Sequence, residues 1–233
     1  MINIGIIHAK REVDSIGQTI NNLNEEFPGI ILNVFCEPGS EFFDGGYKVI
    51  KYVNGVQLGV FLNWLHALSC MQSRLFIKKW ILICEDDIEW IKESGKYFIS
   101  YLNEHQDDES IGFVSGYCSV VNANKEGFGL AKISPYGWCG ALALAIPVRN
   151  VWSILNHPII EKYKTSRDLD NLIGRILLDL GKKLIVHTPS LVNHLGAKHS
   201  TLLKPGSKSV YNEVRRTYDY TTHCLRCKLS KSD

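Results

Sequence analysis

The sequence predicts a single α/β domain, in which a mixed, mainly parallel central sheet is flanked by helices. Short apolar runs without polar alternation recur along the chain, and such runs suit strands that are buried on both faces of a parallel sheet. Between them, apolar residues recur at intervals of three and four, which is the spacing of one helical face. The length of 233 residues, with 45% hydrophobic and 21% charged residues, is that of an ordinary globular protein with a sizeable core.

The N-terminal part of the chain predicts a βαβ unit. Residues 2–9 are Ile-rich and apolar, so we expect them to form the first strand. A helical face follows and ends at Pro28 and Gly29; its apolar members are Val13, Ile16, Ile20, Leu23 and Phe27. Residues 30–36 form the second predicted strand, and the crossover between the two strands is expected to be right-handed.

The rest of the chain alternates between helical and strand-like patterns. Residues 40–54 have a weak pattern, so we expect an irregular segment with room for one short strand. Helical spacing then covers residues 56–71, 93–105 and 169–180, the last ended by Gly181. Strand-like runs cover residues 80–84, 111–119, 141–146 and 184–187. The Gly- and Asn-bearing residues 122–129 predict an exposed excursion.

The C-terminal stretch differs in composition from the rest. Val210, Val214 and Tyr218 recur at four-residue spacing and predict a short final helix. Residues 204–233 contain seven Lys and Arg and three Asp and Glu, a net charge of +4. We therefore expect a domain over residues 1–203 and a basic C-terminal extension over residues 204–233, which packs on the domain or trails it.

Charge and cysteine usage limit the classes of protein that fit. The overall net charge of +2 does not make the whole molecule attractive to nucleic acid, although local patches can be. The seven cysteines lack the spacing of a disulfide framework, which indicates free thiols in a reducing compartment. We find no signal peptide and no apolar run of about 18 residues. We expect a cytoplasmic protein without a transmembrane segment, in a bacterium or in the host cell of a virus.

Three consecutive carboxylates, Glu85, Asp86 and Asp87, follow the apolar run 80–84. They would lie at the carboxyl end of a buried strand, and that edge of an open α/β sheet is where ligands bind. Their mutual repulsion is relieved if a cation binds, and carboxylate oxygens suit Mg²⁺ or Mn²⁺. A solvated acidic turn that closes the strand explains the same residues equally well.

His194 is the best candidate to complete a metal site, because it follows a strand in a turn-rich segment beside Gly196. A lone histidine in such a place is more often a packing or capping residue. Lys198 and Ser200 follow shortly afterwards, and a cation with a hydroxyl group suits a diphosphate. A polar surface loop is the alternative for these two residues.

Asp168 and Asp170 lie where the helix over residues 169–180 begins. Asp168 fits a capping box that starts at Thr165, and a general base is the functional alternative. The chain lacks a GxGxxG fingerprint after the first strand, a Walker A lysine and a GxSxG elbow, so nicotinamide, P-loop and serine-hydrolase chemistry are disfavoured. Close to the C-terminus, His223, Cys224 and Cys227 lack a fourth zinc ligand and are expected to be incidental.

The order of these parts resembles the GT-A fold glycosyltransferases, which use nucleotide sugars, over most of residues 2–203. The stretches ILICEDDIEW and TPSLVNHLGAKHSTLLKPG are similar to the branching N-acetylglucosaminyltransferases of N-glycan synthesis and to small viral and bacterial glycosyltransferases. The EDD triplet resembles the DxD-type motif of that superfamily. The resemblance implies one Rossmann-like catalytic domain over residues 1–203.

The resemblance also implies roles for individual residues. Asp87, together with Glu85 and His194, would hold Mn²⁺ or Mg²⁺ against the donor diphosphate, and Glu85 and Asp86 would also contact the ribose or sugar. Further donor-binding residues are implied at His8, Lys10, Arg11, Glu37, Gln57, Asn63, Gly140, Lys198 and Ser200. Asp168 matches the aspartate of the family's Glu-Asp pair, where an inverting enzyme has its base. Here the pair reads Arg167-Asp168, so Asp170 remains a competitor and the stereochemistry stays open.

Together these residues imply a metal-dependent enzyme that transfers a sugar, with inversion, from a UDP-linked donor to an acceptor hydroxyl. The acceptor is expected to be a glycan, a lipid-linked sugar or a hydroxymethylated pyrimidine of viral DNA, whose phosphates the basic C-terminal stretch could contact. One alternative is a non-catalytic module that binds nucleotide sugars or nucleic acid. Another is a nucleotidyltransferase, although residues 8–11 lack the glycines of a triphosphate-binding loop.

Overall fold

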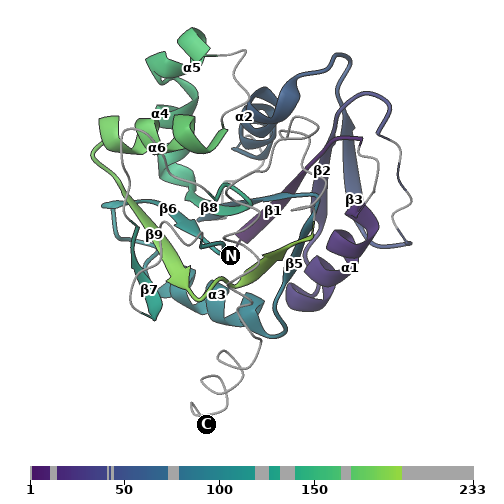
Figure 1. Cartoon of the computed structure of the whole chain (residues 1–233), viewed down its shortest axis with the longest axis horizontal. Coiled ribbons are helices and arrows are strands. Elements are labelled where there is room, and N and C mark those ends of the chain that lie inside the picture. The colour runs from purple at the N-terminus through teal and green to yellow at the C-terminus, as the bar shows by residue number, and fades with distance from the viewer. Residues whose placement is uncertain are drawn as a thin grey trace, which may run out of the picture.

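An eight-stranded sheet runs through the centre of the molecule (Figure 1). The computed structural model describes residues 2–10, 15–40, 42, 45–72, 79–118, 126–131, 140–163 and 169–195. In the spatial order of the sheet, the strands are β3 (Val49–Val53), β2 (Leu32–Cys36), β1 (Ile2–His8), β4 (Trp80–Glu85), β8 (Ala143–Pro147), β6 (Ile111–Ser115), β9 (Lys183–Thr188) and β7 (Gly127–Leu130).

Most strands of this sheet run in one direction. β1 pairs in parallel with β2 and β4, β2 with β3, and β6 with β9. Only β8 and β7 run against their neighbours: β8 is antiparallel to β4 and β6, and β7 to β9. The predicted class, a single α/β domain with a mixed and mainly parallel sheet, is therefore confirmed.

Helices cover both faces of the sheet (Figure 1). On one face, α1 (Ile16–Glu26) and α3 (Ser94–Glu104) pack on a core that includes Leu82 and Cys84 of β4. On the other face, residues from four helices share a core with Ile81 and Ile83. These helices are α2 (Gly59–Gln72), α4 (Val148–Leu155), α5 (Pro158–Tyr163) and α6 (Leu169–Asp179). Successive residues of a strand point to opposite faces, which is why an uninterrupted apolar run fits β4.

A second, two-stranded antiparallel sheet joins β5 (Ile88–Trp90) to β10 (Val192–His194). Neither strand was predicted, because three residues are too few to show a period. Residues 122–129 were predicted to be an exposed excursion, but Gly127–Leu130 forms the edge strand β7. The strand predicted over residues 111–119 ends at Ser115, where the hydroxyl of Ser115 accepts a hydrogen bond from the N–H of Tyr117.

Other boundaries also differ from prediction for physical reasons. The helix predicted from residue 56 begins at Gly59, because the Glu37 carboxylate accepts hydrogen bonds from the N–H groups of Leu58 and Gly59. The helices α4 and α5 were not predicted. The four cysteines in the described part of the chain, at positions 36, 70, 84 and 118, are free thiols, as expected. The predicted final helix and basic C-terminal extension lie outside the described residues. No described helix is long and apolar enough to cross a membrane.

Candidate metal and donor site

The candidate site lies at the edge where β1 and β4 end. In the parallel pair of these strands, Ile7 is opposite Glu85, so His8 and the carboxylate triplet leave the sheet side by side. Asp86 and Asp87 form the turn between β4 and β5. The sheet therefore brings the triplet to the carboxyl edge, which is the expected ligand-binding edge of such a fold.

The buried carboxylates of Asp86 and Asp87 contact different parts of the chain. Oδ2 of Asp86 lies 2.6 Å from Nδ1 of His8 and accepts a hydrogen bond of 3.1 Å from the N–H of Ala9. Oδ2 of Asp87 lies 3.1 Å from Nε2 of His194. Asp86 is 1% exposed and Asp87 is fully buried. Burying a carboxylate is costly unless other groups pair with it; these contacts pair Oδ2 of each residue, and they come from different parts of the chain.

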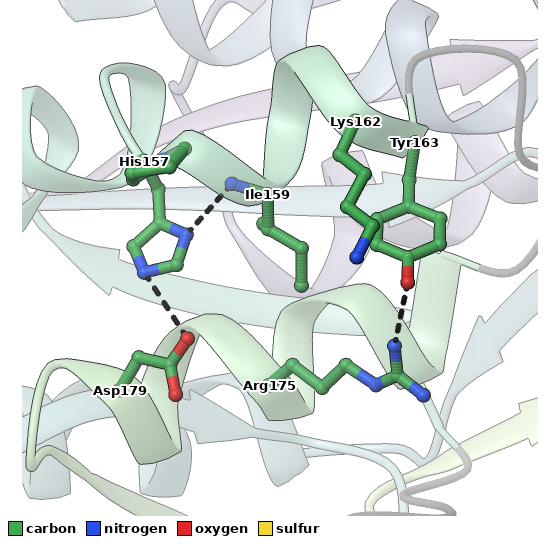
Figure 2. Close-up of a pocket in the computed structure, with 7 residues that line it drawn as sticks. His157, Ile159, Lys162, Tyr163, Arg175 and Asp179 are labelled. Carbon is green, nitrogen blue, oxygen red and sulfur yellow. Dashed lines mark hydrogen bonds and ion pairs between the residues drawn. The ribbon is translucent and has the colours of Figure 1, made fainter.

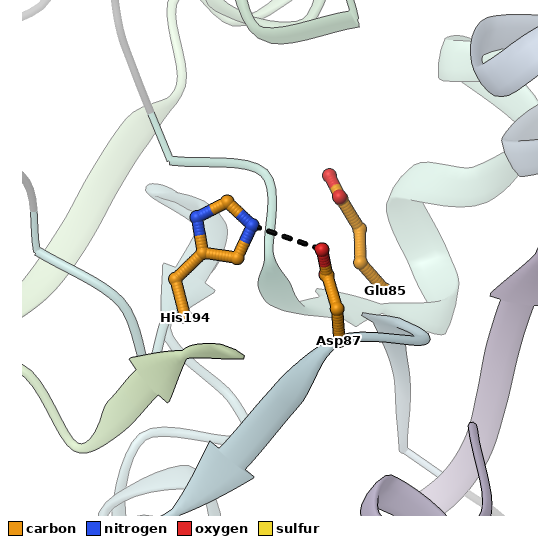
Figure 3. Close-up of side chains that lie close together, drawn as sticks. All are labelled: Glu85, Asp87 and His194. Atoms are coloured by element: carbon orange, nitrogen blue, oxygen red, sulfur yellow. Dashed lines mark hydrogen bonds and ion pairs between the residues drawn. The ribbon is translucent and has the colours of Figure 1, made fainter. Parts of the chain in front are cut away.

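The ribbon of β5 and β10 brings His194 to the triplet. His194 pairs with Ile88, and the N–H of Leu195 donates a 2.7 Å hydrogen bond to the carbonyl of Asp87. One ligand atom from each of Glu85, Asp87 and His194 lies within 4.8 Å of the others. Figure 3 shows the carboxylate of Asp87 between the imidazole of His194 and the side chain of Glu85. Residues 107 positions apart in the sequence thus form one cluster.

The donor atoms of this cluster fit a divalent cation. Two carboxylates and one imidazole are ligands that Mn²⁺ and related ions accept, and a set of three leaves coordination positions for a substrate. The neighbouring Cys84 is not a candidate ligand, because burial raises the pKa of its thiol far above the usual value and so disfavours the thiolate. In the part of the chain that the structure describes, Glu85, Asp87 and His194 are therefore the group that could hold a metal.

Two predicted donor-binding residues have structural partners of their own. Both carboxylate oxygens of Glu37, which is 5% exposed, accept N–H groups at the start of α2, at 2.8 and 2.9 Å. The amide of Asn63 donates to the carbonyl of Phe35 and accepts from the side chain of Asn54, both at 3.0 Å. These bonds attach α2 to the end of β2. Contact with a nucleoside stays a prediction for both residues.

The other predicted donor-binding residues divide between the described and undescribed parts of the chain. His8 is buried against Asp86 at the site, whereas Lys10 and Gln57 are exposed. Arg11, Lys198 and Ser200 lie outside the described residues. The same holds for Asp168.

Asp170, in the first turn of α6, contacts the chain just before β8. Its carboxylate accepts hydrogen bonds from the N–H groups of Gly140, at 3.2 Å, and Ala141, at 2.9 Å. The following residue, Leu142, accepts a 2.9 Å hydrogen bond from the N–H of Glu85 through its carbonyl. Two predicted site residues, Asp170 and Gly140, are thus brought together next to the metal-ligand cluster.

Sequence reasoning missed a row of polar residues on α1. The hydroxyl of Thr19 lies 2.9 Å from the carbonyl oxygen of Asp86 and 2.8 Å from that of Ile88. Asn22 bonds to both the N–H and the carbonyl of Trp90. Glu26 accepts from the N–H groups of two residues at the start of α3, Glu93 and Gly95. Positions 19, 22 and 26 share one helical face, and this spacing was the signal available in the sequence.

Comparisons with known proteins concern the fold alone. A scan against protein-family models finds no match, and a search of curated proteins finds none either. Among solved structures 592 chains match, so the fold is common and does not select one activity. One match is TarS from S. aureus, a GT-A-type glycosyltransferase, with a TM-score of 0.55 and 13% identity over 82% of this chain. The match spans only 36% of the TarS chain. At this identity the likeness concerns the fold alone, a Rossmann-like α/β domain.

Proposed function

We propose that the protein is a metal-dependent glycosyltransferase that moves a sugar from a UDP-linked donor to an acceptor hydroxyl. The observation that carries the proposal is the convergence of Glu85, Asp87 and His194 within 4.8 Å, at the ligand-binding edge of a fold that glycosyltransferases share. A solvated acidic turn does not account for this geometry, because Asp87 is fully buried against a histidine from a distant strand.

The cluster fits a Mn²⁺ or Mg²⁺ ion, which when bound would act as a Lewis acid on the leaving diphosphate. Residues of the chain hold the ligands in place. The contacts of His8 and Ala9 with Asp86 orient the turn so that Asp87 faces His194. The pairing of β5 with β10 sets the position of the His194 imidazole.

We assign the base of an inverting reaction to Asp168 rather than to Asp170. Both carboxylate oxygens of Asp170 already accept hydrogen bonds from backbone N–H groups, those of Gly140 and Ala141. This supports a role for Asp170 in positioning residues 140–141 beside the metal ligands. Asp168, two residues earlier, is then the carboxylate that takes the proton of the acceptor hydroxyl.

The test is metal-dependent binding of UDP and slow release of sugar from a nucleotide sugar in the absence of acceptor. The Asp87→Asn variant should lose the thermal stabilisation that UDP with Mn²⁺ gives to the wild type. Asp107→Asn, whose side chain is 79% exposed at a distant ion pair, is the matched control and should behave like the wild type.

Melting of Asp87→Asn without ligand shows whether the variant is folded, and Glu85→Gln provides a second ligand variant if it is not. Unchanged metal-dependent UDP binding in both ligand variants would refute the metal site. Binding of the donor without any release of sugar by the wild type would favour a non-catalytic binding module.

A further inference from the structure

A cavity lies between α5 and α6, on the helical layer that also contains α2 and α4 (Figures 1 and 2). Its volume is about 440 Å³. Figure 2 shows the side chains of Lys162 and Tyr163 reaching from α5 towards Arg175 of α6. At the other end, His157 lies 3.6 Å from the carboxylate of Asp179. The cavity therefore has two cationic side chains at one end and, at the other end, the Asp179 carboxylate next to a histidine.

The basic end carries donors suited to an anion. Nη1 of Arg175 lies 3.5 Å from the hydroxyl of Tyr163, a contact at the long limit of hydrogen bonding. The ammonium of Lys162 lies 5.3 Å from the centroid of the same ring. Among the described residues, neither cation forms an ion pair with a carboxylate. An incoming oxyanion could therefore accept hydrogen bonds from a guanidinium, an ammonium and a phenol hydroxyl at once.

The field at this end of the cavity favours negative charge. The hydrogen bond from Arg175, followed by the charge of Lys162, lowers the pKa of Tyr163 below its usual value. Solvated lysines and arginines are common on protein surfaces, but here both converge on one side chain within a concave site. Arg175 and Tyr163 are partly buried, so their contacts with a ligand would be less screened than those of freely exposed side chains.

The chain connects this cavity to the proposed metal site. Asp170 lies beside residues 140–141, and the next residue, Leu142, is hydrogen-bonded to Glu85. Arg175 follows Asp170 by five residues, or about 7.5 Å along the helix axis. The first half of α6 and residues 140–142 thus connect the basic end of the cavity to the metal ligands. An acceptor of several sugar units could contact both places.

We propose that the cavity between α5 and α6 binds an anionic group of the acceptor, a phosphate or a carboxylate, through Lys162, Tyr163 and Arg175. The assignment to the acceptor rests on the proposed glycosyltransferase function, whereas the anion site itself rests on the geometry of the cavity. The substrates that this site selects are acidic glycans or phosphate-containing chains, in preference to neutral ones.

The test is a titration of the full chain with inorganic phosphate at constant ionic strength, followed by backbone-amide NMR. Resonances of α5 and α6 should shift, and the Lys162→Gln/Arg175→Gln double variant should bind at least about tenfold more weakly, because it loses two charge-assisted contacts. Lys92→Gln/Lys96→Gln removes two exposed lysines near α3, on the opposite face of the sheet, and should bind phosphate as the wild type does.

Glycerol 3-phosphate and glucuronate, compared at equal concentration, distinguish a phosphate from a carboxylate as the preferred group. Unchanged phosphate affinity in the α5–α6 double variant, or equal losses in both double variants, would overturn the proposal. Weakening confined to the α5–α6 variant supports it. If the wild type binds UDP with Mn²⁺ but binds none of the three anions, this inference fails and the proposed function stands. If the anions bind but the wild type neither binds UDP nor releases sugar, the anion site stands and its assignment to an acceptor falls.

Discussion

Replacing Asn22 by Ala tests how α1 supports the candidate site. The side-chain amide of Asn22 acts as an extra strand partner for β5: Oδ1 accepts the N–H of Trp90 at 2.6 Å, and Nδ2 donates to the carbonyl of Trp90 at 2.9 Å. β5 in turn pairs with β10, which carries His194. The substitution therefore removes two hydrogen bonds from the strand next to the metal ligands.

The expected loss follows from these two bonds. Each contributes about 0.5–1.5 kcal/mol net, so we expect the free energy of unfolding to fall by about 2 kcal/mol. For a chain of this length, that change lowers the melting temperature by roughly 4–8 °C. Alanine is also a better helix former than asparagine by up to ~0.7 kcal/mol, which would mask part of the loss. Asn21→Ala, at an exposed neighbouring position of α1, brings the same gain in helix propensity and leaves both hydrogen bonds of Asn22 in place. It is therefore the matched control.

Thermal and urea unfolding of the two variants measure the difference directly. Asn22→Asp should lie between Asn22→Ala and the wild type, because a carboxylate keeps the acceptor for the N–H of Trp90 but loses the donor to its carbonyl. Metal-dependent UDP binding should weaken in Asn22→Ala and not in Asn21→Ala. A difference of less than about 0.5 kcal/mol between the two alanine variants, where surface substitutions normally fall, would refute the reasoning.

Two further predictions concern packing and the division of roles between two aspartates. A Cβ at Gly95 would lie 2.8 Å from the backbone carbonyl oxygen of Glu26, so Gly95→Ala should lower the free energy of unfolding by about 1–3 kcal/mol. Gly17→Ala is the control, because no atom lies within 4 Å of its new Cβ, and it should not destabilise the protein. Asp168→Asn should lower transfer by about 10²–10⁴-fold with UDP binding intact, while Asp170→Asn should lower stability by about 1–3 kcal/mol. Chemical unfolding and a transfer assay check them, and full transfer by Asp168→Asn or wild-type stability of Asp170→Asn would contradict the assignment.

The main elements of the fold could be predicted because each has a strong local pattern. β1, β4 and α6 consist of long apolar runs or regular helical faces, and their burial matches those patterns. The short strands β5 and β10 could not be predicted in this way. Their formation depends on pairing with each other and on the polar face of α1, which are contacts between distant parts of the chain.

The residues of the candidate site could be predicted from the sequence, but most of their contacts could not. The acidic triplet follows directly from the end of an apolar run, and in the structure Oδ2 of Asp87 lies 3.1 Å from Nε2 of His194; that the two residues bind a metal stays a prediction. That Asp86 would contact His8 rather than point outward depends on β1 lying next to β4. Glu37 and the start of α2 are separated by about 20 residues whose sequence pattern is weak. No spacing rule therefore predicts that the Glu37 carboxylate contacts this helix.

Neighbouring carboxylates differ here in how their charge is balanced. Asp86 faces an imidazole and a backbone amide from β1 and the residue after it, which can stabilise one negative charge. Glu85 and Asp87 lie together around the single imidazole of His194. Because Asp87 is fully buried, negative charge on its carboxylate is costly unless a positive group lies close to it. In the metal-dependent function proposed above, a divalent cation held by these three residues would supply that positive charge.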